Sequence, residues 1–391
     1  MKKLFAMLLV AAMTLSLCAC GGSSNSAAPA AAEKSTAAAS TAASSAAADT
    51  QEASEAAAPA ADGTVYTFRI DDPNPETATC SIILEDWKDW VYEKSNGQLV
   101  MEVYHNAQLG NIADCVTNCL AGISDGFWSA VSIYGGVFPV TSGIQLPMLG
   151  VRNCEVGSAV LMDLLRTTDY MDAEYYGQGL FPVAIHAAST YTILIANGND
   201  YADKAFTFDD FAGLKMRTVS AELSDWATKI GAVPVSISSN EGYENLEKGV
   251  INAAIFDHDK IYTSHLLEVT DCLLDCHVSV PNLFLCLNQE KVNQLPEELQ
   301  QVLKDSGDFF ISELRDGYQQ WIDANMKQAE ELGIPSYTLD DETLDKMQAA
   351  AEETWQGWIE SMNAQGYDGQ AIFDKYQELI EKYNAVYDYD A

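Results

Sequence analysis

The residue best suited to bind a ligand is Arg217, which lies near the carboxyl end of a short alternating segment at residues 213–219. That alternation predicts a strand. The stretch to Asp259 continues as helix, strand, helix and strand, which predicts two βαβ units. In open α/β sheets the ligand crevice lies at the carboxyl ends of the strands. A guanidinium offers a carboxylate two parallel hydrogen bonds, so we expect Arg217 to bind an organic acid.

Two alternatives to this ligand role remain open at this stage. Arg217 could instead pair with an acid of its own chain, and the candidates are Asp209, Asp210 and Glu241. Residues 257–259 form the one compact group of two acids and an imidazole, with the types needed for general acid/base or metal chemistry. The same three residues also fit a solvated loop.

Other catalytic patterns are absent from the sequence. It contains no G-x-S-x-G, no H-E-x-x-H and no phosphate-cradling glycine loop. Cys115 with Cys119 and Cys272 with Cys276 lie four residues apart, so each pair could offer two thiolates to a metal if it lay on a helix. The C-x₂-C spacing of typical zinc sites is missing. We therefore expect no enzyme activity, no cofactor and no metal.

Three motifs in the central stretch resemble the substrate-binding proteins of tripartite ATP-independent periplasmic (TRAP) transporters, the DctP-like family. They are a glycine-led strand at 213–217, a G-A-x-P-V strand at 231–235 and an E-x-Y-x-x-L-x-x-G-V helix at 241–250. Further motifs that resemble the same family lie at 108–110, 122–125 and 146–148. The resemblance spans the folded region and implies an extracytoplasmic solute receptor that delivers a small organic acid to TRAP membrane subunits.

In this family, the arginine at the position of Arg217 pairs with a carboxylate of the ligand, and Trp128 stands at a third-strand ligand position. The remaining residues that we expect around the ligand are Tyr191, Tyr243, Phe256, Asp71 and Asp257. The second basic anchor of many members is missing here, where residues 189–192 read Ser-Thr-Tyr-Thr. We therefore expect a monocarboxylate with an apolar or aromatic body.

The N-terminus resembles a lipoprotein export signal. Two lysines precede a short apolar run that ends in Leu-Cys-Ala-Cys, so residues 1–19 are expected to be removed and Cys20 to be lipidated. The alternative is an ordinary signal peptide that is cleaved elsewhere. Residues 20–64 are dominated by Ala and Ser and predict a flexible tether. The protein is thus expected to be extracytoplasmic and anchored to the cell membrane.

The folded region of about 325 residues exceeds the usual size of a single core, which predicts two lobes. We expect an α/β fold of the periplasmic-binding-protein type, with mixed sheets and one long helix after Pro296 that spans both lobes. Lobe I is assigned to 65–190 plus 282–322, and lobe II to 191–281 plus 323–391. The chain crossings at 186–194 and 278–285, with the long helix, are the expected hinges.

Composition and net charge limit the classes of partner that we expect for this chain. The chain is 48% hydrophobic and 20% charged, as in ordinary globular proteins, but its net charge is −36. That charge argues against nucleic acid as a partner. Seven cysteines follow Cys20, and their spacing shows no disulfide pattern, so we expect them to be mostly free and buried. The alternative functions are a receptor of an ABC importer or a sensor kinase, and a secreted hydrolase.

Overall fold

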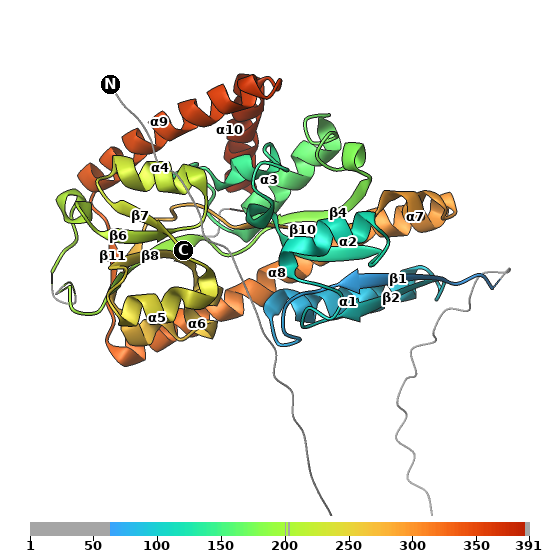
Figure 1. Ribbon diagram of the computed structural model, residues 1–391, viewed down its shortest axis with the longest axis horizontal. Coiled ribbons are helices and arrows are strands. Elements are labelled where there is room, and N and C mark those ends of the chain that lie inside the picture. The colour runs from blue at the N-terminus through green and yellow to red at the C-terminus, as the bar shows by residue number, and fades with distance from the viewer. Residues whose placement is uncertain (1–62, 200, 202–203, 388–391) are drawn as a thin grey trace, which may run out of the picture. The chain divides into compact units, whose positions relative to one another are not determined.

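The computed structural model describes residues 63–199, 201 and 204–387 (Figure 1). The expected signal, Cys20 and the expected tether up to residue 62 therefore lie outside the described residues. A first, five-stranded sheet has the order β2-β1-β3-β10-β4. Its strands are β1 (Tyr66–Asp71), β2 (Leu99–Tyr104), β3 (Gly126–Ala130), β4 (Leu180–Ala187) and β10 (Asn282–Asn288). β10 runs antiparallel to both of its neighbours, so this sheet is mixed.

A second, six-stranded sheet has the order β11-β9-β5-β8-β6-β7. Its strands are β5 (Tyr191–Ala196), β6 (Lys215–Thr218), β7 (Val233–Ser236), β8 (Ala253–Asp257), β9 (Thr270–Asp275) and β11 (Ser336–Thr338). β6 pairs in parallel with both β7 and β8, whereas β5 is antiparallel to β8 and β9. The predicted α/β class with two mixed sheets is confirmed.

The central stretch folds as its sequence pattern predicts. Helices α4 (Ala221–Lys229) and α5 (Gly242–Glu247) lie between β6, β7 and β8 in chain order. The side chain of Ser220 accepts a hydrogen bond from the Leu223 amide and caps α4, as expected from its sequence position. Because β6 and β8 are parallel neighbours, Arg217 near the carboxyl end of β6 and Asp257 at the end of β8 lie at one edge of the sheet.

The chain passes between the sheets at residues 188–190 and 276–281; the first passage lies within the expected hinge segment 186–194, and the second overlaps the expected segment 278–285. The two passages are hydrogen-bonded to each other, through the amides of Ala188 and Tyr191 and the carbonyls of Pro281 and Ser279. Helix α8 (Glu297–Leu332) has the predicted 36 residues, about 54 Å at 1.5 Å per residue. It packs on α1 (Thr79–Lys94) beside the first sheet and on α6 (His258–Thr263) beside the second (Figure 1).

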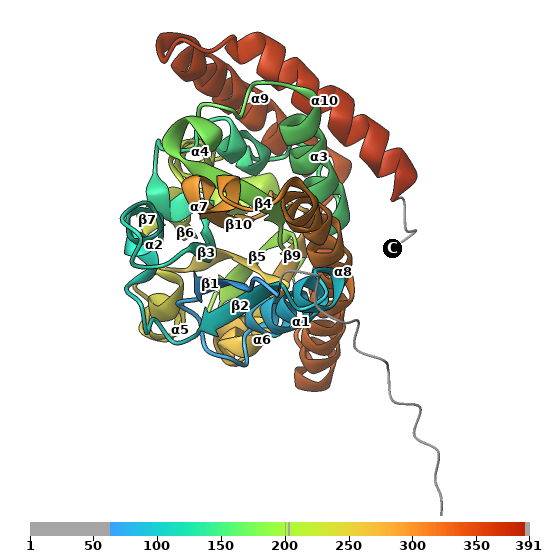
Figure 2. The ribbon, with the colours of Figure 1, turned by 90° about the vertical axis from the view of Figure 1, so that its right-hand side faces the viewer.

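The last two helices, α9 (Asp341–Ala364) and α10 (Gly369–Val386), run together along one side of the structure (Figure 2). α9 contacts α4, and the Trp226 indole of α4 donates to the Met347 carbonyl at 3.0 Å. α10 instead contacts α3 (Cys154–Thr167), and its Tyr376 hydroxyl donates to the Val140 carbonyl at 2.8 Å. α10 thus packs beside the first sheet, although it was expected in lobe II. The lobe boundaries remain a prediction.

The described cysteines, all seven that follow Cys20, are buried and free. Cys115 and Cys119 lie on the short helix α2 (Cys115–Leu120), but Cys272 lies in β9 and Cys276 follows that strand. Cys272 and Cys276 therefore do not share a helix face, and of the two possible thiolate pairs only Cys115 with Cys119 is helical. The short helix α7 (Gln289–Asn293) directly follows β10. Among the described helices, none is long and apolar enough for a membrane span.

Candidate ligand-binding site

Arg217 is held in a fixed orientation by the backbone around it. Its side chain is buried, with 5% of the residue exposed. Nε donates to the Ile237 carbonyl at 3.0 Å and Nη1 donates to the Ile255 carbonyl at 2.6 Å. None of the described hydrogen bonds uses Nη2. Burial lowers the pKa of the guanidinium, whereas Tyr191 and Asp257 raise it, and arginine stays charged throughout the physiological range.

The acids that could have neutralised Arg217 are occupied elsewhere or lie at a distance. Asp210 accepts from Lys204, Thr207 and Tyr201, and Glu241 accepts from Ser238 in a capping box. Within the described residues no carboxylate oxygen lies within 4.0 Å of Arg217. A buried charge without an ion-pair partner is costly, so this guanidinium is well placed to receive an external anion.

The ring of Phe256 lies directly against the guanidinium. The distance from Arg217 Cζ to the ring centroid is 3.9 Å, which is a cation–π contact. Phe256 is only 1% exposed, and a Cβ on Gly242 would lie 2.6 Å from its Cζ atom. The ring is therefore confined between Arg217 and the backbone of α5, where it supports the arginine from one side.

Tyr191 faces the same edge of the sheet. It is opposite Asp257 in the β5–β8 pair and is 6% exposed. Burial raises the pKa of its hydroxyl, Asp257 raises it further, and Arg217 lowers it. In the described part of the chain this hydroxyl has no hydrogen-bond partner. Arg217, Tyr191, Phe256 and Asp257 thus form one cluster at this edge of the sheet.

The side chains of residues 257–259 point to three different elements. Asp257 caps α6 by accepting from the Lys260 amide at 2.8 Å. His258 Nδ1 lies 3.0 Å from the Asn325 amide nitrogen of α8, and Asp259 accepts from the Thr79 hydroxyl of α1 at 3.3 Å. Because the histidine contacts neither acid, the three do not form a catalytic relay. No group of three metal-ligating side chains is found among the described residues.

The other expected ligand residues lie outside this cluster. Asp71 ends β1 and is fully buried, and neither of its carboxylate oxygens has a partner within the described residues. Burial raises the pKa of Asp71 to about 6. The Trp128 indole donates to His186 Nε2 at 3.0 Å in the core of the first sheet. Tyr243 is directed to Glu268, which accepts from its hydroxyl at 3.1 Å.

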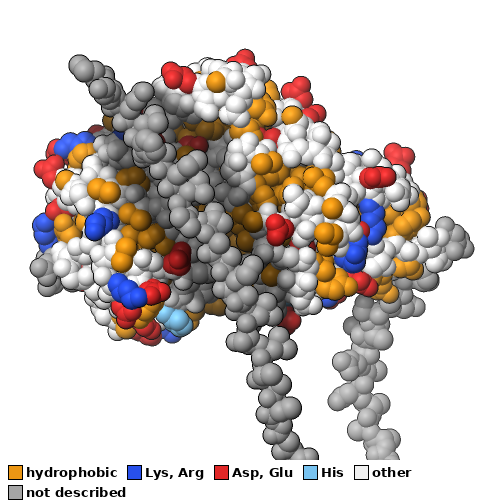
Figure 3. Space-filling model, in the orientation of Figure 1, with side chains coloured by type: hydrophobic (Ala, Val, Ile, Leu, Met, Phe, Trp, Pro, Cys, Tyr) orange, Lys and Arg blue, Asp and Glu red, His pale blue; other side chains and the backbone are white. Residues whose placement is uncertain are grey.

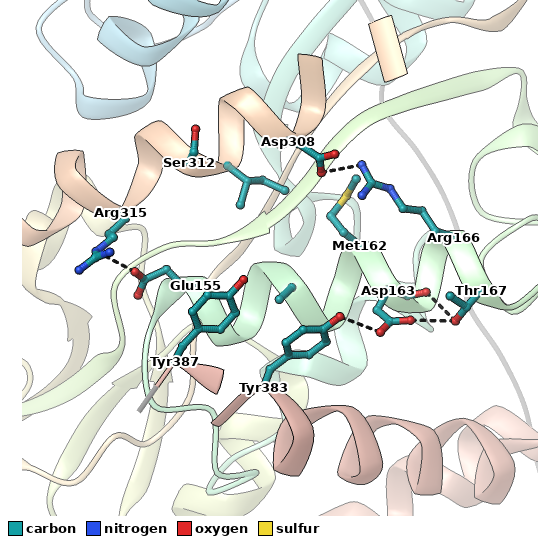
Figure 4. Close-up of a pocket in the computed structure, with 12 residues that line it drawn as sticks. Glu155, Met162, Asp163, Arg166, Thr167, Asp308, Ser312, Arg315, Tyr383 and Tyr387 are labelled. Carbon is teal, nitrogen blue, oxygen red and sulfur yellow. Dashed lines mark hydrogen bonds and ion pairs between the residues drawn. The ribbon is translucent and has the colours of Figure 1, made fainter. Parts of the chain in front are cut away.

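A cavity of about 580 Å³ lies in a different place, between α3, α8 and α10 (Figure 4). Two ion pairs cross it, Arg166 with Asp308 at 2.8 Å and Arg315 with Glu155 at 3.0 Å. None of the residues that we predicted for ligand binding lines it. Lysine and arginine side chains form small separate groups on the face seen in Figure 3 rather than one continuous surface.

Residues 73–361 match the family model of bacterial extracellular solute-binding protein, family 7, named DctP. The chain therefore belongs to family 7 of the bacterial extracellular solute-binding proteins. The function of this family 7 protein is to bind a solute outside the cytoplasm. The 2,3-diketo-L-gulonate-binding periplasmic protein YiaO of Escherichia coli K12 is 23% identical over 282 residues, which are 71% of this chain and 83% of that protein.

Solved structures share the fold. The TRAP solute-binding protein of Rhodoferax ferrireducens, in complex with benzoate, is 20% identical with a TM-score of 0.72, covering 82% of this chain and 99% of that one. A marine metagenome TRAP protein in complex with 3-hydroxybenzoate is 22% identical with a TM-score of 0.70, covering 82% and 100%. The predicted two-lobed binding-protein fold is confirmed for this family 7 member.

Several residues of the site were not recognised from the sequence. The carbonyls of Ile237 and Ile255 orient Arg217, and Gly242 leaves room for the Phe256 ring. Thr79 brings α1 to Asp259. Backbone carbonyls have no sequence signature, but a glycine at the first position of a short helix is a weak signal of close packing.

Proposed function

We propose that this protein is the receptor of a TRAP transporter and that it binds a monocarboxylate with an apolar or aromatic body. The observation behind the proposal is the buried Arg217, whose fork is oriented by two carbonyls and lacks an acid partner. A ligand carboxylate that accepts a hydrogen bond from Nη2 of Arg217 would compensate the positive charge of the guanidinium. The Tyr191 hydroxyl is free to add a further hydrogen bond.

The nature of the ligand follows from the surroundings of the arginine. Phe256 covers one side of the guanidinium, and Asp257 nearby disfavours a second carboxylate on the ligand. Related TRAP proteins bind benzoate, 3-hydroxybenzoate and mandelate, while others bind glucuronate or galacturonate. The first group has a single carboxylate on an aromatic body, which is the class we propose for this chain.

Ligand capture between two lobes requires movement at the hinges. We propose lobe I as 65–190 plus 282–322 and lobe II as 191–281 plus 323–391, with α10 packed on the side of lobe I. The passages at 188–190 and 276–281 and helix α8 would bend together, since the two passages are hydrogen-bonded to each other and α8 packs on α1 beside the first sheet and on α6 beside the second. Small-angle scattering at ligand saturation tests this, and an unchanged radius of gyration would count against closure.

We also propose that the mature chain begins at Cys20 with a diacylglyceryl anchor and that residues 20–64 tether the receptor to the membrane. About 42 flexible residues give a root-mean-square reach of roughly 35 Å. Mass spectrometry of the mature N-terminus tests the anchor. A chain that begins elsewhere, or an unmodified Cys20, would show that the export signal is of the ordinary type.

The ligand proposal is tested with a panel of benzoate, 3-hydroxybenzoate, (R)-mandelate, D-glucuronate and a neutral control, benzamide. A receptor should melt at a higher temperature with its ligand, because a ligand at 100 times its Kd adds about 2.7 kcal/mol to the free energy of unfolding. We expect the aromatic monocarboxylates to raise the Tm and benzamide to leave it unchanged. A Tm raised equally by benzamide would refute carboxylate recognition, and hydrolysis of benzamide, whose amide bond is the hydrolysable bond in the panel, would favour the hydrolase.

A further inference from the structure

The cavity between α3, α8 and α10 is lined by none of the residues around Arg217. Its volume of about 580 Å³ is within the usual range of small-molecule sites. Ala159 and Met162 of α3 and Ile311 of α8 contribute apolar side chains to its two long walls. The two ion pairs that cross the cavity bracket these side chains on both helices, so the cavity has an apolar middle and two charged ends (Figure 4).

The positions of the two ion pairs show that the cavity is elongated. Each pair joins α3 to α8, Arg166 with Asp308 at 2.8 Å and Glu155 with Arg315 at 3.0 Å. Along α8 the spacing of Asp308 and Arg315 corresponds to roughly 10 Å, and along α3 that of Glu155 and Arg166 to roughly 16 Å, at 1.5 Å per residue. A molecule that reaches both ends is therefore about 10–16 Å long.

The end of the cavity that is formed by Arg166 and Asp308 is suited to a carboxylate. The Asp308 side chain is 64% exposed, and an ion pair with so exposed a member contributes little to stability. Asp308 also stays hydrated when the pair opens. A ligand carboxylate could therefore replace Asp308 on the guanidinium of Arg166 and accept two parallel hydrogen bonds from it.

The end of the cavity that is formed by Glu155 and Arg315 is suited to a cation. The Glu155 side chain is only 14% exposed, and its Oε1 atom has no hydrogen bond within the described residues although Arg315 Nε lies 3.0 Å away. An ammonium group carries three N–H donors and would supply a hydrogen bond to this carboxylate. Burial raises the pKa of Glu155, and a second cation beside it would stabilise the charged form. The remaining acid of the lining, Asp163, already accepts from Lys382 and from the Tyr383 hydroxyl.

We propose that this cavity is a second ligand site, for an elongated ω-amino acid whose carboxylate pairs with Arg166 and whose ammonium group pairs with Glu155. The methylene chain of the ligand lies on the apolar middle of the cavity. Two tyrosines at the end of α10, Tyr383 and Tyr387, stack with ring centroids 6.1 Å apart and form a third wall along one side (Figure 4). Binding here is independent of the proposed carboxylate site, because the two sites share no residue.

Calorimetry at about pH 7.5 with 8-aminooctanoate and 12-aminododecanoate, which differ in length, tests the site. Both are zwitterions at this pH, because an alkyl amine keeps its proton up to about pH 10 and a carboxyl group loses its proton at about pH 4. We expect at least one of them to bind, and the fatty acid and the alkyl amine of the same length to bind at least about tenfold more weakly. Arg166→Gln and Glu155→Gln should each weaken binding by a similar factor. Glu342→Gln, which removes an exposed acid paired with Lys346 on α9, is the matched control and should bind as the wild-type protein does.

The wild-type protein alone decides whether the site exists, whether or not the variants fold. No binding of either amino acid, or equally tight binding of the fatty acid or the alkyl amine, would overturn the proposal. Unchanged affinity in folded Arg166→Gln or Glu155→Gln would overturn it as well. Loss of binding in folded Arg217→Ala would place the amino acid at the carboxylate site instead. The proposed function is tested separately by the aromatic carboxylates, so it stands or falls without this second site.

Discussion

Gly242 should be required for carboxylate binding although it does not reach the ligand. Its backbone is right-handed helical, with φ −57° and ψ −51°, so alanine fits the backbone without strain. The added Cβ would lie 2.6 Å from Phe256 Cζ and 3.1 Å from Cε2. To restore an ordinary contact of about 3.5–4.0 Å the ring must move by about 1 Å, and Arg217 lies on its other face.

The expected size of the effect follows from these contacts. Overpacking of this kind costs about 1–3 kcal/mol of stability, and alanine in a helix recovers up to about 1 kcal/mol relative to glycine. We therefore expect Gly242→Ala to lose about 0–3 kcal/mol in unfolding free energy. A displaced guanidinium should weaken carboxylate binding at least about tenfold, which corresponds to 1.4 kcal/mol.

The assays are urea unfolding and calorimetric titration with the best binder of the carboxylate panel. The matched control is Gly357→Ala in the middle of α9, where the added Cβ meets no atom within 4 Å. That variant should gain about 0.5–1 kcal/mol of stability and keep its affinity. Full affinity in Gly242→Ala would refute the idea that Phe256 supports Arg217.

Two further predictions concern stability. Burial alone would lower the pKa of His105, but hydrogen bonds with Asp72 and Glu85 raise it above its ordinary value. The charged imidazole therefore stabilises the fold below about pH 6.5, and this stabilisation is lost as the pH rises through the pKa of His105 in the folded protein. His105→Gln should therefore cost more unfolding free energy at about pH 6 than at about pH 8.5, and equal losses would contradict the assignment. A Cβ on Gly307 would lie 2.0 Å from the Val183 carbonyl oxygen. Gly307→Ala should therefore lose about 1–3 kcal/mol of unfolding free energy, measured by urea unfolding. An unaltered urea midpoint would be inconsistent with the packing of α8 on β4.

Much of the fold could be predicted because its elements have regular hydrophobic spacing. The alternation at 213–219, the buried run before Asp257 and the 36-residue helix after Pro296 each depend on local pattern, and the structure confirms all three. The packing of α10 on α3 could not be predicted in this way, because an amphipathic helix does not specify which apolar surface it covers.

The site was predicted only in part for a related reason. Arg217, Tyr191 and Asp257 lie together because each is at or near a strand end, and these ends meet at one edge of the sheet. Trp128 and Tyr243 have the right chemistry, but their polar atoms bond to His186 and Glu268. Which partner a polar side chain selects depends on tertiary contacts that no sequence spacing encodes.

The central claim is that Arg217 binds the carboxylate of the ligand, and calorimetry of Arg217→Lys and Arg217→Ala tests it most directly. Lysine keeps the charge but loses the two-pronged geometry, so its affinity should fall more than about tenfold. Alanine removes the buried cation and should cost about 2–5 kcal/mol of binding free energy. Both variants should remain folded by circular dichroism. Unchanged affinity in folded Arg217→Ala would contradict the account, because the arginine would then serve only the structure.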